Sequence, residues 1–160
     1  MKVTHETPEQ LILENKPIWL ALFISIFGLV FFAIGLANLS ADLTLGLAFM
    51  AGGLGIGIGF NMIFVRRTQL ILDHPGNYVE LRRRSWLGYS RMTWELRYLD
   101  RAIVETSHSG DSETHRAALV FDGGMDAGTH PVTLVYSSGR GAERAQDAIN
   151  GWLDSRRTTA

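Results

Sequence analysis

The chain has 160 residues, of which 46% are hydrophobic and 19% charged, and its formal net charge at pH 7 is −1. A near-neutral chain lacks the basic field that nucleic-acid binding requires, so nucleic acid is not expected as a partner. Cysteine is absent, which excludes disulfide bonds, thiolate zinc sites and cysteine nucleophiles. The apolar residues are concentrated in one region, between Lys16 and Arg66, where Asp42 is the only ionised side chain.

The first segment, residues 1–17, contains a pattern typical of a helix start. Thr7 suits the N-cap, Pro8 suits the first helical position, and Gln10 completes a capping box. Three apolar residues follow before Pro17 interrupts the pattern. The sequence therefore predicts a short helix that lies at a membrane surface.

Two long apolar runs follow in residues 18–65, from Ile18 to Leu39 and from Leu43 to Val65. Each run reaches the roughly 20 residues that a helix needs to cross a hydrocarbon core. A signal peptide is the competing interpretation of the first run, but the run is too long and a second one follows at once. The connection of three residues predicts an antiparallel transmembrane hairpin.

The second run is rich in glycine. Its alternating glycines look like a strand, but an open strand would leave backbone groups unpaired in lipid, so the length favours a helix. On a helix Ala51, Gly55 and Gly59 share one face, and Gly53 and Gly57 lie nearby. Such a small-xxx-small surface lets another helix approach closely.

The first helix offers its own series of small residues: Ala21, Ser25, Gly28 and Gly35. Packing of the two series on each other is the favoured interpretation, and a site for the helix of another membrane protein is the alternative. Because the glycines of the second helix cover more than one face, a second contact surface also fits the pattern.

Basic residues flank the hairpin and are absent from its connection; they are Lys2, Lys16, Arg66, Arg67 and residues 82–84. The positive-inside rule therefore places both termini in the cytoplasm. Trp19 falls at the predicted inner interface, as an aromatic anchor should.

From Thr68 the pattern changes to the period of two that is typical of strands. Strands are predicted at residues 68–73, 78–87, 90–98, 102–106, 116–121 and 131–137. A helix is predicted at residues 142–153, with Trp152 on its apolar stripe. Residues 66–155 thus form one cytoplasmic domain, followed by a polar tail of residues 156–160.

The pairing of the second and third strands is predicted from charge. A two-residue turn at Gly88–Tyr89 would place Arg82 opposite Glu95. Sliding the strands by two residues would instead oppose like charges, which destabilises a sheet.

This order of elements, two N-terminal spans, a run of short strands and one terminal helix, resembles bacterial membrane proteins with a PH-like (pleckstrin-homology-like) domain. The resemblance covers about residues 18–153 and includes the strand run 96–106. It implies a membrane helical hairpin joined to a mainly β, α+β domain, whose bent antiparallel sheet is capped by the C-terminal helix. The six expected strands are one fewer than the seven usual in the family. A fold of this kind implies no catalytic residue.

No catalytic motif is present, and no cofactor is expected. His108, His115 and His130 fall in predicted loops, residues 107–115 and 122–130, with acidic residues such as Asp111. Their spacing matches no known ligand pattern, so no metal site is predicted.

The clearest candidates for a binding site are six arginines: Arg66, Arg67, Arg82, Arg83, Arg84 and Arg91. Arg66 and Arg67 set the topology or contact anionic lipid. Strand alternation aims Arg83 inward, where it would stack on Trp94 or face a ligand.

The sequence thus favours a non-catalytic accessory or assembly protein of the bacterial inner membrane. Its helices would pack against other integral membrane proteins, as in a larger complex, while the cytoplasmic domain docks to their faces. A module that binds lipid headgroups or small anions through the arginines is the alternative. A membrane enzyme finds no support in the residues.

Overall fold

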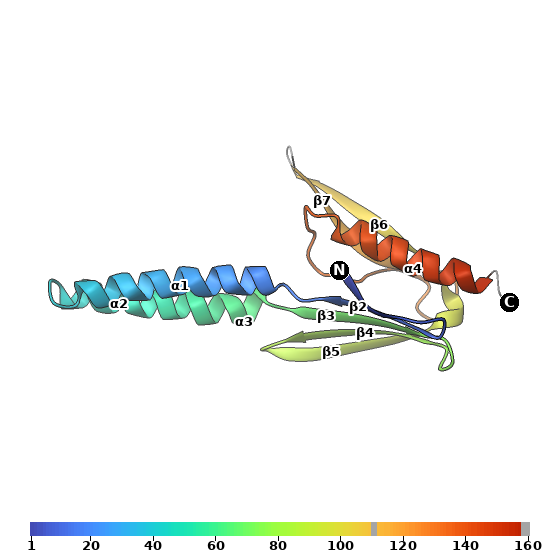
Figure 1. Cartoon of the computed structure of the whole chain (residues 1–160), viewed down its shortest axis with the longest axis horizontal. Helices are drawn as coiled ribbons and strands as arrows, with labels where there is room; N and C mark the ends of the chain where they lie inside the picture. Colours follow the sequence, from blue (N-terminus) through green and yellow to red (C-terminus); the bar gives the residue numbers. More distant parts are fainter. Residues whose placement is uncertain (110–111, 158–160) are drawn as a thin grey trace. The chain divides into compact units, whose positions relative to one another are not determined.

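The computed structural model describes residues 1–109 and 112–157 (Figure 1). Its contacts divide the chain into two compact units. The sheet unit comprises residues 1–15, 68–83 and 90 onwards, and the helical unit comprises residues 16–67 and 84–89. The sheet unit is therefore built from both sides of the apolar segment.

The helical unit is a hairpin of two apolar helices. Its elements are α1 (Ile18–Asn38), α2 (Leu43–Leu54), the π-helix η1 (Gly55–Phe60) and α3 (Asn61–Phe64), the last three forming one continuous helix. Both helices are long and apolar enough to cross a membrane, with mean hydropathies of 2.7 and 1.8. Asp42 begins the second helix, because its carboxylate accepts a hydrogen bond of 2.9 Å from the Leu45 N–H. The prediction of two apolar helices is confirmed.

The N-terminal segment forms two strands, β1 (Lys2–Glu6) and β2 (Gln10–Asn15), so the helix predicted for residues 1–17 is wrong. The predicted contact of the capping box does exist. The Thr7 hydroxyl accepts a hydrogen bond of 3.0 Å from the Gln10 N–H, but it closes the turn between the two strands. Leu11 and Leu13 are fully buried, which is the period of a strand.

The first sheet has the order β1-β2-β3-β4-β5, with β3 at Arg67–Asp73, β4 at Tyr78–Ser85 and β5 at Gly88–Glu95. The turn between β4 and β5 is Trp86–Leu87, so the turn predicted at Gly88–Tyr89 is wrong. The predicted pairing of Arg82 with Glu95 requires that turn and is wrong as well. Glu95 instead forms an ion pair of 2.7 Å with Arg97.

The second sheet follows a short 3₁₀ turn, η2 (Leu96–Tyr98), and contains β6 (Leu99–Ser109), β7 (Ser112–Phe121) and β8 (Gly128–Pro131). All its neighbouring strands are antiparallel. β6 and β7 extend well into residues 107–115, which were predicted as a loop. The last predicted strand, residues 131–137, contributes only Pro131 to β8 and one bridge from Ser137 to His115.

The C-terminal helix α4 (Gly141–Arg157) packs against β6 and β7 and reaches β1 and β2. The predicted helix is confirmed and is longer at its C-terminal end, so residues 156–157 of the predicted tail are helical; residues 158–160 lie outside the described residues. The core is shared by both sheets and α4, and its fully buried side chains include Leu11, Leu70, Leu81, Leu119 and Ile149. A helical hairpin with an antiparallel sheet domain and a terminal helix is therefore observed.

Candidate helix-packing and membrane-interface sites

The two apolar helices touch backbone to backbone at glycines. A Cβ atom placed on Gly28 would lie 2.7 Å from the carbonyl oxygen of Gly53, and one on Gly35 would lie 2.6 Å from that of Gly46. Gly57 also belongs to this seam, because a Cβ there would lie 3.8 Å from Gly28 Cα. Side chains larger than hydrogen would separate the helices, so these glycines set the distance between them.

Other small residues of the second helix lie outside the seam: Ala51, Gly52, Gly55 and Gly59. Ala51 is exposed. A Cβ atom on any of the three glycines would meet no other atom within 4 Å among the residues that the structure describes. We call these four residues the open face. The predicted set thus divides into two, since Gly53 and Gly57 pack on α1 whereas Ala51, Gly55 and Gly59 do not.

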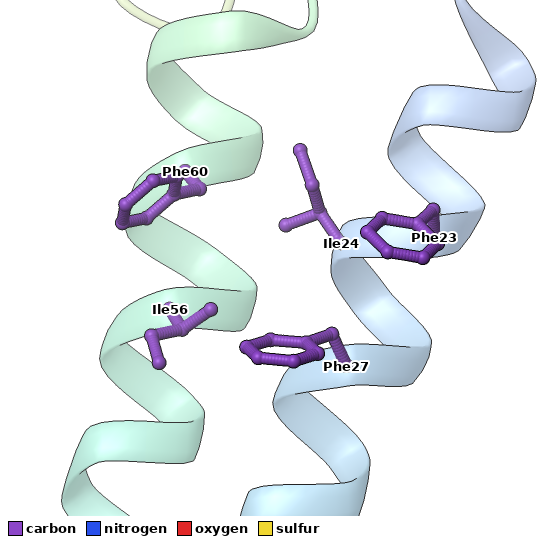
Figure 2. Close-up of a pocket in the computed structure, with 5 residues that line it drawn as sticks. All are labelled: Phe23, Ile24, Phe27, Ile56 and Phe60. Carbon is purple, nitrogen blue, oxygen red and sulfur yellow. The ribbon is translucent and has the colours of Figure 1, made fainter.

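An apolar groove borders the open face. Figure 2 shows the five side chains that line it between the two helices: Phe23, Ile24 and Phe27 from α1, and Ile56 and Phe60 from η1. Its volume is about 250 Å³. Ile56 and Phe60 directly follow Gly55 and Gly59 in the chain, so the groove and the open face are adjacent on the second helix. An entirely apolar lining suits a side chain of another helix or a lipid chain.

A polar contact joins the two helices at the end of the π-helix. The Asn61 side-chain amide donates a hydrogen bond of 3.2 Å to the Ser25 hydroxyl and one of 2.6 Å to the Gly57 carbonyl oxygen. π-Helices are rare and commonly mark functional positions. The sequence does not predict this element, because glycine alternation carries no signal for a π-turn.

Two of the six candidate arginines hold a buried carboxylate. Glu80 is only 1% exposed, and it contacts Arg82 Nη2 at 3.0 Å and Arg91 Nε at 2.6 Å. The hydrogen bonds from Arg82, and then the charges of both arginines, hold the pKa of Glu80 below its ordinary value although burial opposes the shift. Arg82 and Arg91 therefore neutralise a protein carboxylate.

Arg83 joins the two sheets. Its guanidinium donates hydrogen bonds to the carbonyl oxygens of Pro131, at 2.5 Å, and Val132, at 3.3 Å. Burial lowers the pKa of this half-buried group. Trp94 instead makes tilted ring contacts with Phe121 and His130, with ring centroids 5.5 and 5.1 Å away. The predicted stacking of Arg83 on Trp94 is therefore wrong, because the guanidinium is used on backbone carbonyls.

The other three candidates, Arg66, Arg67 and Arg84, all belong to the helical unit. Arg66 Nε donates a hydrogen bond of 3.2 Å to the Ile63 carbonyl oxygen at the end of α3. Arg67 begins β3, and Arg84 is exposed near the end of β4. Arg66 and Arg67 therefore lie where the chain leaves the apolar helices, and Arg84 belongs to the same unit.

The three histidines lie on three different strands and not in loops. His108 faces Glu113 at 3.3 Å, and the His115 ring contacts the Thr106 hydroxyl. His130 contacts the Asp126 carbonyl oxygen. Among the described residues, which exclude Asp111, no group of three metal-ligating side chains is found.

No protein-family model matches the sequence, and a search of curated proteins finds no match.

Proposed function

We propose that this chain is a non-catalytic accessory or assembly protein of a bacterial inner membrane. The helical hairpin spans the membrane and packs laterally against other integral membrane proteins, and the sheet unit docks on their cytoplasmic faces. The open face of the second helix, bordered by an apolar groove, is the observation that carries this proposal.

The physical argument comes from the environment of a helix in lipid. Association there depends on close packing, because lipid is as apolar as the side chains, and small residues permit that packing. Gly28, Gly53 and Gly57 already serve the internal seam. Glycine lowers the stability of a helix by about 1 kcal/mol relative to alanine in water, so glycines outside the seam call for another role. Close approach of a partner helix to Gly55 and Gly59 supplies that role.

The proposed orientation places both termini in the cytoplasm. Lys16 and Arg66 bracket the hairpin at one end, whereas the connection at the other end carries only the acidic Asp42. Two antiparallel sheets with a C-terminal helix support a PH-like domain on the cytoplasmic side, although the described residues form eight strands and the family usually has seven.

Binding of lipid headgroups or small anions through the arginines is the weaker alternative. Arg82 and Arg91 hold Glu80, and Arg83 holds two carbonyl oxygens. An anion site on the sheet would have to compete with these protein groups. Arg66, Arg67 and Arg84 are exposed, and contacts of exposed cations with anionic lipid accompany membrane anchoring.

The test is affinity purification of the full chain from its native membranes in mild detergent, with mass spectrometry of what accompanies it. The wild type is compared with Gly55→Leu/Gly59→Leu and with Ala33→Leu, a matched change at an exposed small residue of α1. We expect a stoichiometric membrane partner with the wild type and with Ala33→Leu, and its loss in the double variant. A partner-free wild type, or one whose partners survive the double change, would contradict the proposal.

A further inference from the structure

The turn between β4 and β5 exposes a cluster of large apolar side chains. Trp86 is 77% exposed, Leu87 67% and Tyr89 59%. We call these three residues the tip cluster. Exposed aromatic side chains of this size at the end of a hairpin mark a surface that contacts something else.

The tip cluster belongs to the helical unit, although the rest of β4 and β5 belongs to the sheet unit. The chain path explains this grouping. β3 begins at Arg67, three residues after α3 ends at Phe64. The short turn at residues 74–77 makes β3 and β4 antiparallel neighbours (Figure 1). Ser85, at the end of β4, therefore lies at the end of the sheet where the chain leaves the apolar helices.

We propose that the tip cluster inserts into the headgroup interface of the same bilayer that the two helices cross. This inference rests on the proposed membrane-spanning role of the helices. Trp and Tyr prefer this interface because each combines a large apolar ring with a polar group. Leu87 supplies an aliphatic side chain that reaches toward the acyl chains.

The flanking residues support lipid as the occupant. The same unit contains three exposed cations: Arg66, Arg67 and Arg84. Cations near an apolar membrane contact attract anionic headgroups. Trp19, 84% exposed in the first turn of α1, is a further exposed aromatic side chain of the helical unit. The tip cluster would thus be a third membrane contact, in addition to the two helices.

The absence of cysteine allows a direct test with single-cysteine variants of the full chain. An environment-sensitive NBD fluorophore is attached at Leu87→Cys, in the tip cluster. A matched label at His74→Cys sits in the other turn of β4, which is also exposed, and a label at the exposed Leu29→Cys reports the middle of α1. Each protein is reconstituted in phosphatidylcholine–phosphatidylglycerol vesicles that carry nitroxide quenchers at shallow or deep positions of the acyl chain.

We expect the label at position 87 to shift to the blue and to be quenched several-fold more strongly than that at position 74, with shallow quenchers more effective than deep ones. Deep quenchers should dominate at position 29. Quenching at 29 with none at 87 beyond the level at 74 would overturn this inference alone. A blue shift at 87 without lipid quenching, as in contact with a second protein copy, would also overturn it. Absence of quenching at 29 would overturn the membrane-spanning role and this inference together.

Discussion

The indole N–H of Trp152 donates a hydrogen bond of 2.8 Å to the backbone carbonyl oxygen of Thr7, joining the C-terminal helix to the turn between the first two strands. The indole ring is buried, and the Arg156 guanidinium lies 4.5 Å from its centroid. Segments from before and after the apolar hairpin therefore meet inside the sheet unit. The apolar hairpin is inserted between two parts of one domain.

Substitutions of Trp152 should separate the contribution of its hydrogen bond to stability from that of its packing. Trp152→Phe keeps most of the apolar contact and should lower the free energy of unfolding of the sheet unit by about 1 kcal/mol. Trp152→Ala leaves a cavity and should lower it by about 3–5 kcal/mol. Trp86→Phe is the control, because Trp86 lies outside the core of the sheet unit and the change keeps an apolar ring, and it should change the stability of the sheet unit by less than about 0.5 kcal/mol. Denaturation in detergent followed by circular dichroism measures all three; equal losses at the two tryptophans would contradict the assigned role.

The N-terminal strands should stabilise the sheet unit. Leu13 is fully buried in β2, opposite Leu70 of β3, so Leu13→Ala should lower the free energy of unfolding by about 2–5 kcal/mol. Val3→Ala in the exposed β1 is the matched control, with an expected change of less than about 0.5 kcal/mol. Amide exchange of β3 measures the effect. Unchanged protection of β3 in Leu13→Ala would mean that β2 does not stabilise the sheet unit, and would contradict this prediction.

The apolar helices could be predicted from the sequence because their signal is local and long, and the same holds for α4. The N-terminal strands could not, because β2 has six residues and its partner β3 comes only after the whole hairpin. Thr7 and Gln10 form the same hydrogen bond in a helix cap and in a strand turn, so the motif did not discriminate between them.

The candidate sites show the same division. Spacing identified the glycine-rich surface, but it could not say that Gly53 and Gly57 pack internally while Gly55 and Gly59 stay open, because that choice depends on the rotation of one helix against the other. The sequence does not predict the tip cluster, because it favours a turn between β4 and β5 at Gly88–Tyr89, two residues after the turn that the structure shows. A Gly first in a two-residue turn is favoured, yet Gly88 lies in β5 and the turn is made by Trp86–Leu87.

The glycines of the seam and those of the open face should respond differently when a methyl group is added. A Cβ on Gly28 would overlap the backbone of the second helix, so Gly28→Ala should destabilise the hairpin by about 1–3 kcal/mol. Gly52→Ala is the matched change on the open face and should leave the packing of the isolated hairpin intact. Amide exchange of both helices in detergent measures the difference. Equal loss of protection in the two variants would show that the seam is placed wrongly.

Glu80 makes the stability of the sheet unit depend on pH. Its folded pKa is below the ordinary value of 4.5, so its contribution is fully present above that value and is lost as the pH falls through the folded pKa. Glu80→Gln leaves Arg82 and Arg91 without the buried negative charge and should lower the free energy of unfolding by about 2 kcal/mol at pH 7.

The difference between the wild type and Glu80→Gln should therefore shrink as the pH is lowered below 4.5, because acid protonates the wild-type carboxyl group. Glu95→Gln is the control, since Glu95 is half-exposed in its ion pair with Arg97, and should cost less than about 1 kcal/mol. Denaturation curves at a series of pH values measure both variants. A difference at Glu80 that stays constant into acid would mean that hydrogen-bond geometry, and not the charge of the carboxylate, stabilises this part of the sheet.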